Sequence, residues 1–288
     1  MRTFPGGFTI LMAVYAGDSA ELFIRAVQSC FGNSLLPDQF ILVVDGPVPM
    51  ALELAIADSE RRYPMQLVYL PKNRGLAEAL NEGLKHITTE WVVRADADDI
   101  NLPERFVLQA KAAQATPAPD LMGGAILEVE MDGTAIAIRR TPEQHDSIRR
   151  FARIRNPFNH MTVAVRLSWI KKCGGYPNLR LKEDYALWAL MLKNGARTSN
   201  IPEILVHATT GLDMYARRGG WRYARDEILL QRHLLDCGLK GRMTACIHGF
   251  GRGIVFLFPA WLRGMFYRRA LRFRGASRGV ERRSLWLS

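Results

Sequence analysis

The chain has 288 residues, of which 48% are hydrophobic and 23% are charged. This composition excludes an intrinsically disordered chain and a polytopic membrane protein, and the length is sufficient for one large domain or two small ones. The formal net charge is +11. Taken alone, a charge of this size indicates a polyanionic partner, either a nucleic acid or an anionic membrane.

The positive charge is concentrated near the C-terminus. Residues 217–288 hold 16 Lys and Arg against 4 Asp and Glu, a net charge of +12, whereas residues 1–216 hold 23 against 24. We therefore expect a near-neutral domain over 1–216 and a basic, amphipathic helical segment over 217–288. The four cysteines include no CxxC pair, which is typical of reduced thiols in a cytosolic protein.

Apolar strands and amphipathic helices alternate over about the first 115 residues. The sequence predicts strands at 8–14, 40–44, 65–70 and 91–95, helices at 19–31, 48–62 and 73–87, and a further helix with Pro103 at its first position. This alternation predicts an α/β fold with a mostly parallel, helix-covered central sheet.

The pattern changes after Ala125. An Asp-Gly pair between two apolar runs is a strong hairpin signal, and a glycine after a helical pattern commonly ends the helix. On these signals the sequence predicts hairpin strands at 127–131 and 134–138, a strand at 161–166, a helix at 184–194 before Gly195, and basic helices beyond Arg217.

Polar residues follow three of the predicted parallel strands. Tyr15 comes after the first, Asp45 after the second, and the acidic run Asp96–Asp99 after the fourth. Because ligands bind at the carboxyl ends of the strands in open α/β sheets, we expect these side chains to share one edge of the sheet. For Asp45 alone, an ordinary Asp-Gly turn explains the residue equally well.

The acidic run holds three carboxylates within four residues, Asp96, Asp98 and Asp99. Helix capping accounts for one of them at most. A divalent cation relieves their mutual repulsion, and Mg²⁺ or Mn²⁺ binds carboxylate oxygens together with substrate phosphates. The sequence has no Gly-rich phosphate loop, which argues against a P-loop or a dinucleotide-binding fold.

Two other polar sites have a structural explanation beside a functional one. Arg74 precedes a predicted helix, where an arginine either contacts a base or phosphate or lies solvated at the helix start. Glu183 and Asp184 open another helix, whose dipole favours carboxylates in the first turn. Taken by themselves, these residues leave both explanations open.

Together, these segments resemble the inverting family 2 glycosyltransferases, which have the GT-A fold. The matching segments keep the family's order over about residues 8–210: MAVYAGD, ILVVDGP, NRGLAEALNEGL, VRADADDINLPERF, NHMTVAVR, KKCGGYP and KEDYALWALMLKNGA. MYARRGGWRY and the basic tail resemble the bacterial subgroup that builds exopolysaccharide, capsule or O-antigen units. The resemblance implies a nucleotide-sugar donor, expected to be a UDP-sugar, and a lipid-linked saccharide acceptor.

The resemblance also implies a metal site that uses Mg²⁺ or Mn²⁺. Asp98 falls on the metal-binding position of the family's DxD motif, and Asp96 on the position that contacts the ribose or the metal shell. His207, after a predicted strand, falls where some members have a metal or phosphate ligand. These three residues are the expected metal ligands.

Donor and acceptor roles follow from the same resemblance. Asp45 matches the residue that recognises the nucleoside base, and Arg74 matches a residue that contacts the uracil or the diphosphate. The backbone near Ala13 and Tyr15 would line the pocket for the base. The remaining matches are the catalytic residues: Asp184 as general base, and Glu183 in support. A carboxylate that deprotonates the acceptor hydroxyl during attack opposite the leaving group gives inversion.

The basic tail favours a membrane over a nucleic acid, since no nucleic-acid-binding motif accompanies its charge. Its apolar run 254–262 has nine residues with a proline, whereas a membrane-spanning helix needs about 20. Arginines and aromatic residues alternate over 263–274, which is typical of a segment at an anionic bilayer surface. We therefore expect a cytoplasmic protein, peripheral at the inner face of the membrane; a helical cap with a solvated basic face is the alternative.

Two other classes of function remain open on the sequence alone. One is a nucleotidyltransferase on a similar scaffold, although the Gly-rich N-terminal loop expected there is absent. The other is a non-catalytic, membrane-associated adaptor, against which the intact acidic residues count.

Overall fold

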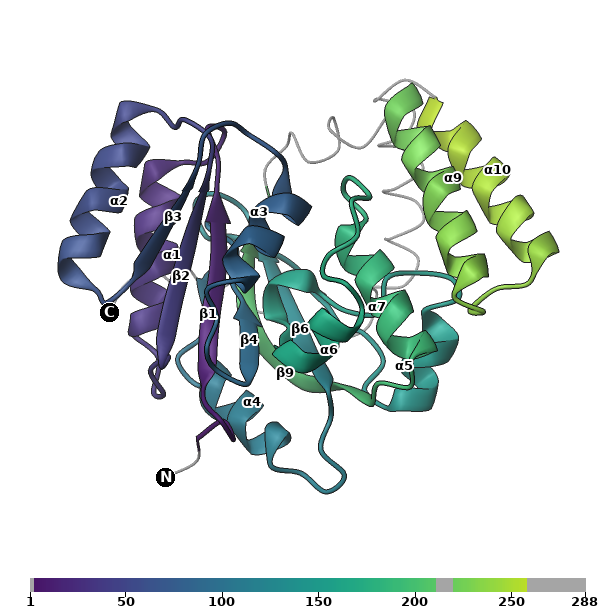
Figure 1. Ribbon diagram of the computed structural model, residues 1–288, viewed down its shortest axis with the longest axis horizontal. Coiled ribbons are helices and arrows are strands. Elements are labelled where there is room, and N and C mark those ends of the chain that lie inside the picture. The colour runs from purple at the N-terminus through teal and green to yellow at the C-terminus, as the bar shows by residue number, and fades with distance from the viewer. Residues whose placement is uncertain (1–2, 211–219, 258–288) are drawn as a thin grey trace.

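The computed structural model describes residues 3–210 and 220–257, with the backbone alone at 222 and 252–257 (Figure 1). The strands are β1 (Phe8–Val14), β2 (Gln39–Asp45), β3 (Gln66–Leu70), β4 (Trp91–Arg94), β5 (Ile100–Asn101), β6 (Leu121–Val129), β7 (Ala135–Arg139), β8 (Ala164–Arg166) and β9 (Thr198–Thr209). The helices are α1 (Ala20–Phe31), α2 (Met50–Arg62), α3 (Leu76–Leu84), α4 (Arg105–Ala113), α5 (His145–Phe151), α6 (Leu167–Lys172), α7 (Glu183–Lys193), α9 (Trp221–Asp236) and α10 (Arg242–Leu257), with a 3₁₀ turn at His160–Thr162.

The strands form one sheet in the order β3-β2-β1-β4-β8-β6-β9-β5, with β7 paired to β6. The first four strands are parallel, as predicted, and β1 lies between β2 and β4. Beyond β4 the sheet is mixed, because β8 runs antiparallel to both β4 and β6. The predicted hairpin is confirmed as β6–β7.

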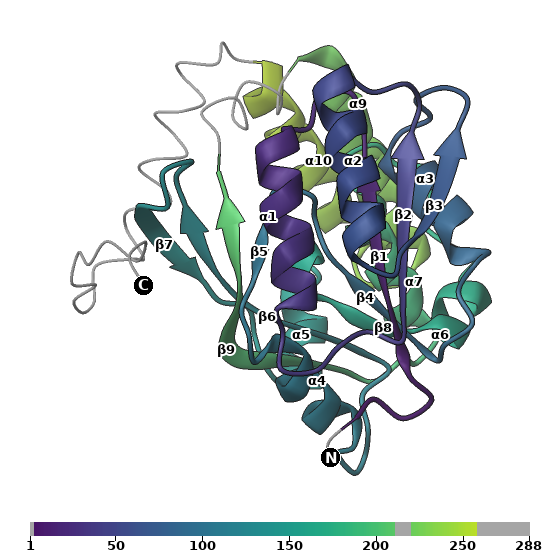
Figure 2. The same ribbon diagram turned by 90° about the vertical axis from the view of Figure 1, so that its left-hand side faces the viewer.

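Helices cover both faces of the sheet (Figure 2). Buried side chains of α1, α2 and α4 pack on one face, and those of α3, α6 and α7 pack on the other. Helix α3 approaches closely at Gly83, where a Cβ atom would lie 2.5 Å from the Leu11 side chain. A glycine is therefore required there by packing.

Helix α9 packs on the outer side of α7, beside its hairpin partner α10 (Figure 1). Leu230 and Leu234 of α9 are buried in one cluster with Tyr185 and Ala189 of α7. The structure thus joins this part of the basic segment to the α/β body, and the boundary at 216/217 stays a prediction. Among the helices of the described residues, none has the length and apolar character to cross a bilayer.

Several predicted bounds need correction. Pro103 lies before α4, which begins at Arg105, and the helix predicted over 73–87 is confined to α3 because residues 73–75 form a loop held by Asp45. The strand predicted over 161–166 is reduced to β8 by the preceding 3₁₀ turn. The predicted arginine-rich segment 263–274 lies outside the described residues.

Candidate active site

The parallel strands bring the predicted donor residues to one edge of the sheet. Strands β1, β2 and β4 end at Val14, Asp45 and Arg94, and the acidic run follows β4 directly. Tyr15 follows β1, and its backbone N–H donates to Asp18 Oδ2 at 2.9 Å. This turn therefore lies at the same edge as the acidic run, as the topology predicts.

Asp96, Asp98 and Asp99 form one cluster, with a carboxylate oxygen of each within 4.8 Å of the others. Asp98 lies at the solvent edge of the cluster, and partial loss of hydration there, followed by the charges of Asp96 and Asp18, raises its pKa. Asp99 is buried; its Oδ1 accepts from the Thr209 N–H at 2.9 Å, and its Oδ2 has no hydrogen-bond partner among the described residues. A buried oxygen without a partner, beside two more carboxylates, fits a hard divalent cation.

Arg94, which the sequence reasoning missed, lies beneath the acidic run. Its buried guanidinium forms an ion pair with Asp96 and donates to the Leu11 carbonyl at 3.2 Å. Arg105, also fully buried, donates to the Arg94 carbonyl at 2.8 Å. Burial lowers the pKa of Arg105 to about 10, yet it stays cationic at neutral pH. Two buried guanidinium groups thus offset part of the carboxylate charge.

Asp45 has a clear structural role at this edge. Its Oδ1 accepts from the Arg74 N–H at 2.7 Å, and its Oδ2 from the Gly75 N–H at 2.9 Å. The Arg74 side chain is half-exposed and pairs with Glu78 Oε2 at 2.6 Å. Asp45 therefore fixes the start of α3, and the donor-binding roles of Asp45 and Arg74 remain predictions.

The acidic pair predicted at a helix start opens α7. Glu183 is 6% exposed, and its burial, followed by the charge of Asp184, raises its pKa to about 7. Asp184 Oδ2 accepts a 2.5 Å hydrogen bond from Asn156 Nδ2, a contact across 28 residues that no sequence signal indicated. The side-chain amide of Asn156 holds the Asp184 carboxylate in one orientation.

Charges from the start of α7 and from the acidic run influence the pKa values of the same two residues, His160 and Tyr176. His160 Nε2 and the Tyr176 hydroxyl are 3.3 Å apart, and the charges of Arg94, Asp96 and Asp184 reach both residues. Burial, followed by the charge of Arg94, lowers the pKa of His160. The charges of the acidic run and of the α7 start thus both act on His160 and Tyr176, which indicates that the two acidic groups face the same region of the molecule.

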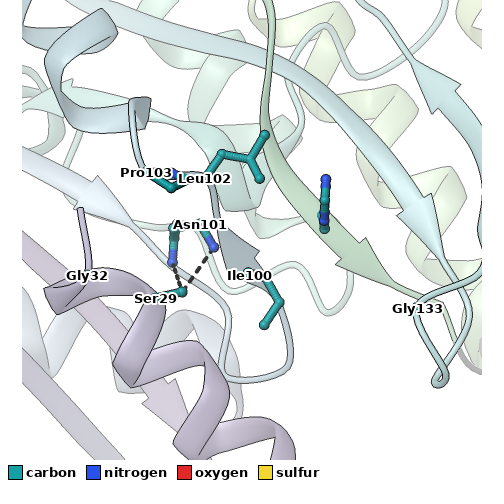
Figure 3. Close-up of a pocket in the computed structure, with 8 residues that line it drawn as sticks. Ser29, Gly32, Ile100, Asn101, Leu102, Pro103 and Gly133 are labelled. Carbon is teal, nitrogen blue, oxygen red and sulfur yellow. Dashed lines mark hydrogen bonds between the residues drawn. The ribbon is translucent and has the colours of Figure 1, made fainter. Parts of the chain in front are cut away.

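His207 lies beside the end of the acidic run but outside the carboxylate cluster. It falls inside β9 rather than after a strand, because β9 continues to Thr209, and it pairs with Ile100 of β5. With Ser29 and Asn101 it lines a hollow of about 400 Å³, in which Asn101 bonds to Ser29 (Figure 3). Burial lowers its pKa. Within the described residues it is not part of the carboxylate cluster, and its role as a metal ligand stays a prediction.

Known proteins share the sequence pattern and the fold of this chain. The model of "Glycosyl transferase family 2" matches residues 9–174. The chain is 36% identical to the Escherichia coli UDP-Gal:alpha-D-GlcNAc-diphosphoundecaprenol beta-1,3-galactosyltransferase, over 92% of this chain and 96% of that protein. It is 33% identical to the amylovoran biosynthesis glycosyltransferase AmsE of Erwinia amylovora, over 91% and 98% of the two chains.

Solved structures share the architecture. TarS 1-349 of S. aureus, in complex with UDP-GlcNAc, superposes with a TM-score of 0.64 at 17% identity, over 87% of this chain and 73% of that one. The mannosyltransferase PcManGT of Pyrobaculum calidifontis, in complex with GDP-Man and Mn²⁺, gives 0.60 at 18% identity, over 94% and 82%. The chain spans 44% of a longer TarS structure. At these identities the likeness establishes the fold.

Proposed function

The chain belongs to glycosyl transferase family 2 and has the GT-A fold, and from this premise we propose that it transfers a sugar from a UDP-sugar to a lipid-linked saccharide in cell-surface polysaccharide biosynthesis. The name of the E. coli relative supports this donor and acceptor class, the UDP-GlcNAc complex of TarS supports the donor, and the name of the Erwinia relative supports a biosynthetic role. The observation that carries the proposal is the cluster of Asp96, Asp98 and Asp99 after β4, together with a second acidic group at the start of α7, where Glu183 is buried and Asp184 is held by Asn156. A nucleotidyltransferase would not need the second group.

The donor side of the site uses the edge of the parallel strands. Asp98 and Asp96, with the adjacent Asp99, would hold Mg²⁺ or Mn²⁺, and the bound cation would neutralise charge on the leaving diphosphate. Asp45 and the backbone near Tyr15 would bind the base. Buried Arg94 holds Asp96 in place by its ion pair, so the cluster is positioned before the donor arrives.

The acceptor side uses the start of α7. Asp184 would accept the proton of the acceptor hydroxyl as this hydroxyl attacks the anomeric carbon, and Asn156 orients the carboxylate for that task. Glu183 would support it, since its raised pKa lets it hold a proton near neutral pH and limits repulsion within the pair. A single base that acts opposite the leaving group supports inversion, so an α-linked donor would give a β-linked product.

The Asp184→Asn variant tests this proposal. We expect it to lose transfer from UDP-galactose to a synthetic GlcNAc-diphospholipid at least 100-fold, since general base catalysis contributes about 10²–10⁴-fold, and to keep Mn²⁺-dependent UDP binding. Asp98→Ala is the matched variant and should lose that binding, as calorimetry would show. Loss of UDP binding in Asp184→Asn would contradict the base role. Pyrophosphate release, or no nucleotide binding by the wild type, would favour a nucleotidyltransferase or an adaptor.

The C-terminal segment supports a second part of the proposal, peripheral attachment to the cytoplasmic face of the membrane. Residues 217–288 carry the net charge of +12, and α10 exposes an apolar stripe of Met243, Ile247 and Phe250. On α9, Trp221 and Arg225 are exposed one turn apart. Apolar and basic side chains together suit an anionic bilayer surface, where a lipid-linked acceptor lies. The charge by itself would also suit a nucleic acid, but no nucleic-acid-binding motif accompanies it in the sequence.

A further inference from the structure

A buried ion pair connects α9 to the residue that precedes the acidic pair of α7. Lys182 Nζ lies 3.1 Å from Glu227 Oε2 and donates to the Tyr223 hydroxyl at 3.0 Å. The Glu227 side chain is 1% exposed and that of Lys182 is 15% exposed. Gln231 Nε2 donates to the other Glu227 oxygen at 2.8 Å. Both charges are therefore enclosed, and each depends on the other.

The backbone just before this ion pair is strained. Leu181 has a φ of +58°, which lies in the left-handed region. Among the described residues, no other non-glycine residue has a positive φ. Such a conformation persists when the surrounding structure holds it in place. Lys182 comes next, and its carbonyl accepts the first hydrogen bond of α7, from the Ala186 N–H at 2.9 Å. The anchoring of Lys182 on α9 thus fixes the point where α7 begins.

We propose that Glu227, acting through Lys182, is a positioning residue for the Glu183–Asp184 pair. This inference rests on the proposed role of Asp184 as the base. Lys182 is adjacent to Glu183, so a shift of its backbone moves the first turn of α7 and the carboxylates on it. Helix α9 lies along α7 (Figure 1), and His233 Nε2 contacts the Ala186 carbonyl at 3.0 Å, one turn further along. Helix α9 is therefore part of the transfer site as well as of the basic segment.

A double-mutant cycle on the full chain tests the proposal. Glu227→Gln, Lys182→Met and the double variant should each lower kcat at least tenfold and leave the KM for UDP-galactose within twofold, since the donor edge lies on other elements. The double variant should lose no more than the worse single variant, because the two residues act as one unit. Lys193→Met is the control: it removes a 3.0 Å contact to the Asp236 carbonyl at the other end of the α7–α9 interface, and its kcat should stay within twofold.

Hydrogen exchange gives a readout that is independent of sugar transfer. Without substrate, amides of residues 181–186 should exchange faster in Glu227→Gln and Lys182→Met, and at the wild-type rate in Lys193→Met. Unchanged kcat and exchange, or losses that add in the double variant, would overturn the proposal. If Glu227→Gln fails to fold, Lys182→Met carries the test. A wild type that transfers no sugar would overturn the proposed function, while the exchange rates would still decide the link between Glu227 and α7.

Discussion

Glu183 shows how one buried carboxyl group links the proposed chemistry to stability. Its pKa lies at about 7 instead of the ordinary 4.5, because burial and the charge of Asp184 disfavour its ionised form. Between pH 4.5 and about pH 7, Glu183 therefore keeps its proton in the folded chain, whereas in the unfolded chain it has released it. The stabilising contribution is complete below pH 4.5 and is lost as the pH rises through 7.

We predict that Glu183→Gln, a neutral isostere, becomes stabilising relative to the wild type as the pH rises from 5 to 8. A pKa difference of this size corresponds to on the order of 3 kcal/mol at most. Urea unfolding at a series of pH values measures the difference. Glu21→Gln is the control for removing an acidic side chain, since Glu21 also lies in the first turn of a helix but is exposed. A Glu183→Gln difference that stays constant across this range would contradict the prediction.

At this scale, the sequence revealed residues in dense local patterns and missed those defined by tertiary contact. Asp96 and Asp98 stood out because three carboxylates crowd one turn. The sequence analysis placed Arg94 in an apolar strand and gave it no role. Its contacts with Asp96 and the Leu11 carbonyl depend on the folded structure, and no local pattern predicts them. The role of Asn156 could not be predicted from the sequence, because its hydrogen bond to Asp184 forms only when α7 packs in the folded chain.

Among the elements, the parallel half of the sheet was predictable because each strand and helix carries its own periodicity. The bounds that differed are those set by distant contacts. Residues 73–75 look helical in sequence, yet the Asp45 carboxylate binds two of their backbone N–H groups and holds them in a loop. Strand β9 extends to Thr209 because it pairs with β6 along its length, which no local pattern reports.

The close packing of α3 on the sheet gives a prediction for the substitution Gly83→Ala, which adds one methyl group. In Gly83→Ala the new Cβ would lie 2.5 Å from Leu11 and 2.8 Å from Val43, so either these buried side chains or α3 itself must shift. We expect a loss of about 1–3 kcal/mol in the free energy of unfolding, the usual cost of overpacking. UDP binding should weaken as well, because α3 begins at the loop held by Asp45.

The control for this substitution is Gly249→Ala in α10. Gly249 is also a helical glycine, but the nearest contact of its added Cβ is an ordinary 3.6 Å. It should be neutral or stabilise by up to about 1 kcal/mol, since alanine is the better helix former. Equal effects of the two substitutions in urea unfolding would show that crowding against the sheet is not the cause.

For the whole molecule, charge asymmetry and packing give two complementary views of the C-terminal segment. From the sequence, the segment is a basic attachment to a neutral domain, because charge can be counted residue by residue. The structure adds that α9 is packed on α7 and shares the buried pair Lys182–Glu227. Glu227 is one of only four acidic residues in 217–288, and its burial could not be read from composition.

The exposed apolar side chains of α10 and the basic charge of the segment predict that the chain binds anionic membranes. We expect the full chain to sediment with vesicles of phosphatidylcholine and phosphatidylglycerol, to bind pure phosphatidylcholine vesicles less, and to be released by 0.5 M salt, because screening weakens the attraction between arginines and anionic headgroups. The double variant Ile247→Ser/Phe250→Ser should bind at least tenfold more weakly, since burial of such side chains contributes about 1.5–3 kcal/mol each.

Met50→Ser/Leu54→Ser is the matched control for this surface. These residues form an equally exposed apolar pair one turn apart on α2, and Figure 1 shows α2 and α10 at opposite sides of the molecule. If α10 faces the bilayer, the control keeps wild-type binding while the α10 variant loses it. Equal losses in both variants would mean that exposed apolar groups bind lipid without regard to place. Unchanged binding in both would leave charge alone as the attachment and would remove the α10 stripe from the proposal.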